Sequence, residues 1–193
     1  MERVWDYPRP PAVVPCERRV RVELGGQALA DSGRALRVLE TSHPPTIYVP
    51  QADVCMDLVE IGRGRSTWCE FKGAARYVDA VVDGRRTRSI GWTYPRPSAG
   101  YEWLADHIAF YPGRVGGAWL DDELVEAQPS DFYGGWITAD LVGPFKGPAG
   151  TLNWLRAGRP GLAWGAGRRG ARSAAEYPQG ESNPRYGRER PAC

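Results

Sequence analysis

The chain has 193 residues and a formal net charge of +2, which suits one ordinary domain with appendages. Eight Trp, nine Tyr and four Phe can supply a sizeable core, while 24 Gly and 17 Pro indicate many turns. No apolar run approaches the roughly 18 residues of a membrane-spanning helix, and residues 1–15 are proline-rich without an apolar signal-peptide segment. We therefore expect a soluble, cytoplasmic protein that makes no membrane contact.

Short strands dominate the periodic segments. Alternating or β-branched runs predict strands over residues 19–24, 27–31, 35–40, 46–49, 66–82, 85–94, 108–111 and 118–126. Gly25-Gly26 and Asp83-Gly84 are signals for two-residue hairpin turns. The fold class that follows is mainly β, with antiparallel strands.

Helix is expected only in one or two short pieces. The ambiguous segment over residues 52–60 favours a helical turn that begins near Pro50, and Ser98 can cap a short helix over residues 98–107. The long strand over residues 66–82 is expected to be broken at Lys72-Gly73.

Composition divides the chain into four parts: an extended arm over residues 1–16, a β domain over 17–128, a strap rich in Gly, Pro and Trp over 129–164, and a tail over 165–193. The tail contains no Leu, Ile, Val, Met, Phe or Trp, so we expect it to be disordered. Its six Arg against three Glu make it basic. Contact with nucleic acid through this tail is a weaker interpretation than an inert, solvated tail.

The two lysines are the most informative residues. Of 25 basic residues only Lys72 and Lys146 are lysines, and both lie in a Phe-Lys-Gly tripeptide. A chain that otherwise uses arginine has kept lysine where a compact, rotatable ammonium is wanted. Lys72 also lies three residues after Cys69, whereas Lys146 lies in the Gly/Pro-rich strap, where a backbone-covering role is the simpler interpretation.

Two interpretations of Lys72 stay open. It can hold an anionic group or act as a nucleophile, with Cys69 and Glu40 as flanking catalytic candidates. In a strand, Cys69 would instead be an ordinary core residue and Lys72 a solvated partner of Glu70. Gly73 indicates a bulge or a close backbone approach in either case.

The sequence predicts no metal site and identifies no cofactor. The potential zinc ligands are scattered without a Cys-x-x-Cys pair, at Cys16, Cys55, Cys69, Cys193, His43 and His107. A zinc site needs about four ligands with regular spacing. We therefore expect no structural zinc.

A set of motifs follows in a characteristic order: Ala30-Asp31-Ser32, Leu39-Glu40, Tyr48-Val49-Pro50, Cys69-x-x-Lys72-Gly73, Tyr77, Trp92-x-Tyr94 and Ala109-Phe110-Tyr111. Over about residues 17–127 they resemble the bacterial family known as "domain of unknown function 427". The resemblance implies a β-tent fold, in which two small antiparallel sheets lean together, as in methionine sulfoxide reductase B. Residues 5–10 and 134–151 resemble a subgroup with an extended C-terminus.

The resemblance implies a fold for this chain, but we do not infer an activity from it. Where the family frequently has Cys-Pro-Tyr-Lys-Gly, this chain has Glu70 and Phe71, so the polarity of the pocket there is not inherited. The family is also labelled nucleotidyltransferase-like, an activity that needs a Gly-Gly or Gly-Ser turn followed about ten residues on by two acids that hold a metal. Neither Gly25-Gly26 nor Gly116-Gly117 has such a pair at that distance.

The sequence leaves two hypotheses about the function of the protein. The leading hypothesis is a small-molecule-binding β domain, enzymatic or not, with a polar cleft around Lys72. Its candidate ligand-binding residues are Ser32, Tyr48, Asp53, Tyr77, Trp92 and Tyr94. The alternative is a non-catalytic interaction module that docks a protein or nucleic acid through the basic tail and the two Trp-x-Tyr-Pro-Arg-Pro arms at residues 5–10 and 92–97. Convergence of the polar groups in one cleft favours the first, and a flat aromatic patch favours the second.

Overall fold

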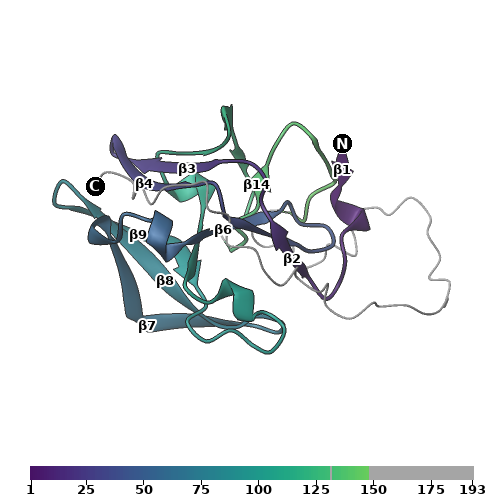
Figure 1. The fold of residues 1–193 in the computed structure, drawn as a ribbon, viewed down its shortest axis with the longest axis horizontal. Helices are drawn as coiled ribbons and strands as arrows, with labels where there is room; N and C mark the ends of the chain where they lie inside the picture. The colour runs from purple at the N-terminus through teal and green to yellow at the C-terminus, as the bar shows by residue number, and fades with distance from the viewer. Residues whose placement is uncertain (131, 148–193) are drawn as a thin grey trace, which may run out of the picture.

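A seven-stranded antiparallel sheet organises residues 1–130 and 132–147, the part of the chain described in a computed structural model (Figure 1). Its strands lie in the spatial order β2 (Ala12–Pro15), β5 (Leu36–Leu39), β6 (Thr46–Pro50), β10 (His107–Phe110), β9 (Arg85–Thr93), β8 (Gly73–Val82) and β7 (Val59–Cys69). Every neighbouring pair runs antiparallel. The predicted mainly β, antiparallel fold class is confirmed.

A four-stranded sheet packs against one face of the first sheet. Its strands lie in the order β12 (Glu123–Leu124), β11 (Gly117–Leu120), β3 (Val20–Leu24) and β4 (Gln27–Ser32). The predicted hairpin turns are confirmed: Gly25 and Gly26 join β3 to β4, and Asp83 and Gly84 join β8 to β9. All four residues have φ between 49° and 79°, as two-residue turns that match the strand twist require.

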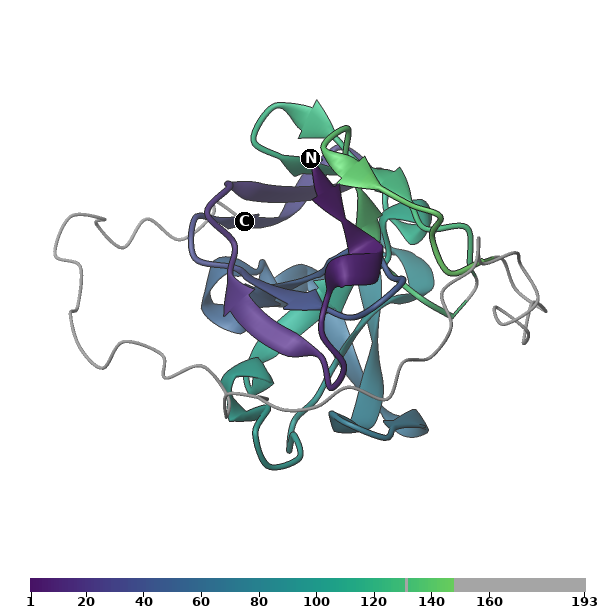
Figure 2. The ribbon, with the colours of Figure 1, turned by 90° about the vertical axis from the view of Figure 1, so that its right-hand side faces the viewer.

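Two small sheets attach the flanks of the chain, so the expected pair of sheets is too simple a description. β1 (Glu2–Arg3) pairs in parallel with β15 (Leu141–Val142), and β13 (Glu126–Ala127) pairs antiparallel with β14 (Trp136–Ile137). Figure 2 shows the N-terminal strand lying beside the green C-terminal strand. The N-terminal arm and the start of the strap are thus held next to each other.

Helical structure is confined to single 3-10 turns within the described residues. They are η1 (Val4–Asp6), η2 (Gln51–Asp53), η3 (Met56–Leu58), η4 (Glu102–Leu104) and η5 (Pro112–Arg114). The helix expected over residues 98–107 is reduced to η4 because the positive φ of Gly100 and of Asp106 interrupts a helix on either side. None of the helices in this part of the chain is long or apolar enough to cross a membrane. The cytoplasmic location stays a prediction.

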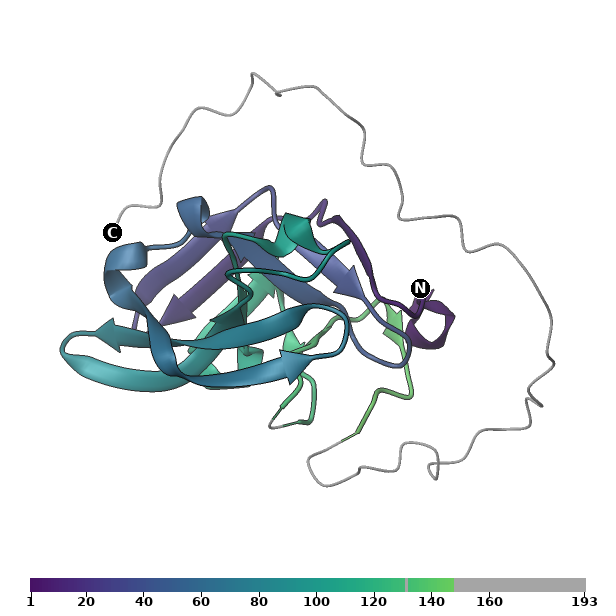
Figure 3. The same cartoon turned by 90° about the horizontal axis from the view of Figure 1, so that it is seen from below.

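The strand predicted over residues 66–82 is interrupted next to the predicted break at Lys72-Gly73, but its two parts do not continue in one direction. It is two strands, β7 and β8, that reverse direction at Glu70–Lys72 and pair as a long hairpin (Figure 3). Gly73 opens β8 with φ 91°, a conformation that a β-branched or bulky residue rarely adopts. The helical turn expected near Pro50 is present as η2 and η3, and β7 begins directly after them at Val59, where its first residues pair with Val78–Ala80.

Side-chain alternation in the seven-stranded sheet separates two cores. Ile47 and Val49 of β6 face the four-stranded sheet, whereas Tyr48 between them faces the opposite side. In β10 and just after it, Phe110 and Tyr111 divide in the same way. The first core is mainly aliphatic, and burial of each large side chain in it contributes about 1.5–3 kcal/mol. The second core is rich in aromatic rings and lies under the candidate site.

The division into arm, domain, strap and tail stays a prediction. β2 lies in the arm and nevertheless forms the edge of the seven-stranded sheet by pairing with β5. Residues 148–164 of the strap and the tail over 165–193 lie outside the described residues.

Candidate ligand-binding cavity

The aromatic face of the seven-stranded sheet is hollowed into a cavity of about 400 Å³. Residues of β6, β8 and β9 form its base, and the β7–β8 turn and the loop after β5 form its walls. Segments from both flanks complete it, since Arg9 on one side and Gln128 and Lys146 on the other also line it.

Packed aromatic rings form the base of the cavity. The Trp92 ring lies 4.5 Å from that of Tyr111, and its Nε1 donates a hydrogen bond to the Tyr48 hydroxyl at 3.2 Å. Tyr94 stacks on Tyr48 with 6.4 Å between ring centroids. Burial raises the pKa of Tyr48 and of Tyr94, so both phenols stay neutral at physiological pH. The base offers flat apolar faces with hydroxyls between them.

Lys72 enters the cavity from the β7–β8 turn with its side chain only 10% exposed. Its Nζ lies 3.6 Å from Oε2 of Glu40, which is an ion pair longer than a hydrogen bond. No other described residue forms a hydrogen bond or ion pair with this ammonium. Lys72 is the last residue of the turn, and its carbonyl accepts a hydrogen bond from the Ser98 N–H at 3.1 Å. The ammonium therefore has donor capacity to spare at the cavity wall.

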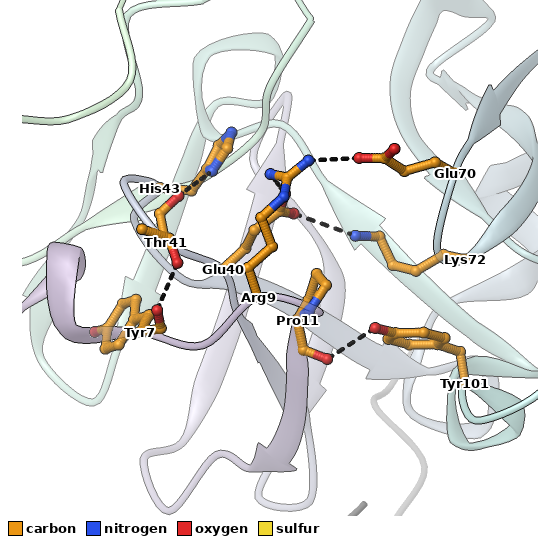
Figure 4. A network of polar contacts seen from close by, with 9 residues as sticks. All are labelled: Tyr7, Arg9, Pro11, Glu40, Thr41, His43, Glu70, Lys72 and Tyr101. Carbon is orange, nitrogen blue, oxygen red and sulfur yellow. Dashed lines mark hydrogen bonds and ion pairs between the residues drawn. The ribbon is translucent and has the colours of Figure 1, made fainter. Parts of the chain in front are cut away.

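Arg9 connects the N-terminal arm to the two walls (Figure 4). Its Nη1 donates to Oε1 of Glu40 at 3.0 Å, and its Nη2 donates to Glu70 at 2.5 Å. The guanidinium also lies 5.1 Å from the centre of the Phe71 ring. Glu40 thus faces two cations with its two oxygens, Arg9 with one and Lys72 with the other.

His43 also lines the cavity. Its Nδ1 lies 3.1 Å from the carbonyl oxygen of Thr41, so Nδ1 carries the proton and donates a hydrogen bond to that oxygen. Its Nε2 is buried and has no hydrogen-bond partner among the described residues. Burial lowers the pKa of His43 to about 4, against the charge of Glu40 and with help from Lys146 and Lys72. His43 is therefore a neutral hydrogen-bond acceptor at pH 7.

Hydrogen bonds of the backbone hold Lys146 against the loop that carries His43. The Lys146 N–H donates to the Ser42 carbonyl at 2.7 Å, and the Lys146 carbonyl accepts from Nε2 of Gln128 at 3.0 Å. Gln128 is buried, and its Oε1 also accepts from the Gly135 N–H at 3.1 Å. The Lys146 ammonium lies 4.5 Å above the Tyr133 ring. The second lysine thus reaches the cavity from a segment fixed at both its N–H and its carbonyl.

The lining carries an excess of positive charge. Arg9, Lys72 and Lys146 face Glu40 and Glu70, which leaves one cation uncompensated. Cys69 adds a free thiol that is partly exposed. The arrangement suits a molecule with an anionic group and a planar apolar part.

Within residues 1–130 and 132–147 no group of at least three His, Cys, Asp or Glu side chains is placed to hold a metal ion. The absence of zinc stays a prediction.

Seven of the nine predicted site residues line this cavity: Glu40, Tyr48, Cys69, Lys72, Tyr77, Trp92 and Tyr94. Ser32 and Asp53 do not. The Ser32 hydroxyl donates to Asp53 at 2.7 Å, and Arg34 donates to both oxygens of Asp53 at 2.9 and 2.6 Å. This pair ties β4 to η2 and is a structural contact.

Sequence reasoning missed His43, Gln128 and Lys146 as parts of the site. The scarcity of lysine was a usable signal for Lys146, since it shares the Phe-Lys-Gly tripeptide with Lys72. Its place in a Gly/Pro-rich segment favoured the other interpretation. Arg9 lies in the Trp-x-Tyr-Pro-Arg-Pro arm at residues 5–10, which was expected to serve the alternative function.

The described domain matches a known protein family. The family described as "Domain of unknown function (DUF427)" matches residues 12–121, which is more than half of the chain. Comparison with curated proteins produced no match. Arg9, Gln128, Tyr133 and Lys146 lie outside the matched residues, so both the matched domain and its flanking segments build the cavity.

Proposed function

Since the chain belongs to the family described as "Domain of unknown function (DUF427)", which assigns no activity, we propose its function from the cavity: it binds a small molecule that joins an anionic group to a planar apolar part. Membership confirms the family resemblance seen in the sequence. The β-tent likeness and the extended subgroup stay predictions.

One observation carries the proposal. The two lysines of the chain, against 23 arginines, line a single cavity. A buried ammonium costs free energy unless it is paired, and among the described residues Lys72 has a 3.6 Å ion pair with Glu40 and no hydrogen bond. A ligand anion would supply the hydrogen bonds that this ammonium lacks. The rotatable ammonium of lysine also adapts to ligand geometry better than a planar guanidinium.

The aromatic base narrows the class of ligand further. The rings of Tyr48, Trp92 and Tyr94 favour a flat molecule. Burial of Trp92 and Tyr94 also counts against docking of a partner through the rings of the arm at residues 92–97, since buried rings cannot present a flat aromatic patch.

The test uses anilinonaphthalene sulfonate, a fluorescent molecule with one anionic group and flat rings. We expect saturable binding to the native protein, and weaker binding by at least about fivefold for Lys72→Met and for Lys146→Met. Arg85→Met, which removes an exposed cation outside the cavity, is the matched control and should leave the affinity unchanged. Equal affinity of all four proteins would refute the proposal.

The natural ligand can then be sought directly. Native mass spectrometry of the protein purified from its own host should detect a bound mass that is retained by the native chain and lost by Lys72→Met. A ligand with no acidic group would contradict the assigned role of the lysines.

A further inference from the structure

A second cavity lies on the other face of the β7–β8 hairpin. It measures about 410 Å³ and is lined by Arg63, Ser66, Trp68, Arg76, Arg96 and Ser98, among others. Alternation along the strands separates it from the first cavity, because Thr67 and Tyr77 face the first and Ser66 and Arg76 face the second. Trp68, on the edge strand of the sheet, borders both.

The second cavity is basic, with no opposing acid. No Asp or Glu is among its described lining residues. Arg63, Arg76 and Arg96 are exposed, and none forms a hydrogen bond or ion pair with a side chain in the described part of the chain. Other arginines are paired: Arg19 contacts Asp31 at 2.7 Å, and Arg34 contacts Asp53 at 2.6 Å. The N–H donors of three guanidinium groups at the second cavity are thus available to bind an anion.

Trp68 supplies a flat apolar surface beside these cations. Its side chain is 72% exposed, in contrast to Trp136 in the first core, which is 1% exposed. In the β7–β8 register Trp68 pairs with Ala74, and Ser66 pairs with Arg76. The indole and the Arg76 guanidinium are therefore diagonal neighbours on one face, and the small Ala74 leaves the indole uncovered.

We propose that this face binds single-stranded nucleic acid, with phosphates on Arg63, Arg76 and Arg96 and a base stacked on Trp68. Arginine forks match phosphate oxygens in two-point contacts, and an exposed ring beside a cationic groove is the arrangement with which proteins hold single strands. A duplex keeps its bases inside and cannot stack one on Trp68. An acidic peptide would use the arginines but would gain little from the indole. The site shares only Trp68 with the proposed ligand cavity and does not depend on its function.

The experiment measures binding of a fluorescent oligothymidylate of about 12 nucleotides to the full chain by anisotropy, between about 50 and 200 mM salt. Arg76→Ser/Arg96→Ser is compared with Arg85→Ser/Arg88→Ser. Both double variants remove two exposed arginines from the same part of the fold and leave the basic tail intact, but the second pair lies outside the cavity. Trp68→Ala, with Trp103→Ala as its exposed control, tests stacking at constant charge.

We expect Arg76→Ser/Arg96→Ser to reduce the salt slope by about 1.4, which corresponds to two lost phosphate contacts, and Arg85→Ser/Arg88→Ser to leave it unchanged. Trp68→Ala should weaken binding about fivefold or more, and Trp103→Ala should not. Lys72→Met should bind the oligonucleotide normally even where it loses the small molecule, which separates the two proposals. Absence of binding by the native chain, equal losses in the two double variants, or competition by polyglutamate as strong as by the oligonucleotide would overturn the inference.

Discussion

Lys72 and Lys146, the two lysines of the chain, line the same cavity although one lies in the β7–β8 turn and the other follows β15. Different parts of the fold hold each one. The Ser98 N–H holds the carbonyl of Lys72, and the Ser42 carbonyl and the Gln128 amide fix the backbone of Lys146. Glu40 faces Lys72 but is also bonded to Arg9, so it neutralises neither lysine fully.

We expect Lys72 to favour ligand binding and to lower the stability of the folded protein. We expect Lys72→Met to leave the melting temperature unchanged or raised, because methionine removes a mostly buried charge whose ion pair is long, while binding of anilinonaphthalene sulfonate is lost. Lys72→Arg should keep the fold and weaken binding, because the planar guanidinium is larger. A fall of several degrees in melting temperature for Lys72→Met would instead assign the ion pair with Glu40 a structural role.

His43 should make stability depend on pH in a defined window. Its pKa is 6.5 in the unfolded chain and about 4 in the folded one. Above pH 6.5 both states are neutral, and as the pH falls from 6.5 to about 4 only the unfolded chain takes up the proton. The free energy of unfolding therefore falls by up to about 3 kcal/mol as the pH decreases over that range.

His43→Gln removes this titration. Thermal melts between neutral pH and about pH 4.5 should show a steeper loss of melting temperature for the native protein than for the variant, before most carboxylates begin to protonate. Identical pH dependence of the two proteins would mean that His43 is not buried as a neutral group.

Gly73 should be the least replaceable of three comparable glycines. An alanine Cβ there would lie 2.9 Å from the Ser98 hydroxyl, at a φ of 91°, and would disturb the hydrogen bond from the Ser98 N–H to the Lys72 carbonyl. Backbone strain of this kind costs about 1–3 kcal/mol before the clash is added. Gly26→Ala has a positive φ but free space, and Gly64→Ala has neither problem. Chemical denaturation should rank the losses as Gly73 above Gly26 above Gly64; any other order contradicts the geometry of the turn.

Gln128 should hold the segment that carries Lys146. Gln128→Ala leaves the Lys146 carbonyl and the Gly135 N–H without partners, at a cost of about 2–4 kcal/mol. Hydrogen exchange should become faster at the amides of Gly135 and Lys146. Gln27→Ala, on an exposed side chain of β4, is the control and should change stability by less than about 0.5 kcal/mol. Unchanged exchange at Lys146 in Gln128→Ala would mean that Ser42 alone fixes the segment.

The sequence pattern was enough to predict the strands and turns that depend on residues close together in the chain. Alternation predicted most strands, and Gly25-Gly26 and Asp83-Gly84 predicted their turns, because strand period and turn φ depend on neighbouring residues. Over residues 52–60 the helical turn expected near Pro50 is present as η2 and η3, but the start of β7 at Val59 was missed, and the strand expected over residues 66–82 is part of a hairpin. There the pairing of Val59 with Ala80 across the hairpin decides the structure, and no local signal reports it.

The sequence by itself determined that the protein is mainly β with antiparallel strands, to which family it belongs, and that Lys72 is a candidate site residue. Only the tertiary structure decided that Lys146 lines the same cavity as Lys72, that Ser32 and Asp53 lie elsewhere, and that Arg9 bridges two walls. The physical reason is that a binding cavity is made by contacts between segments far apart in the chain. Those contacts follow from how the sheets pack and where both flanks attach, and spacing along the sequence does not encode them.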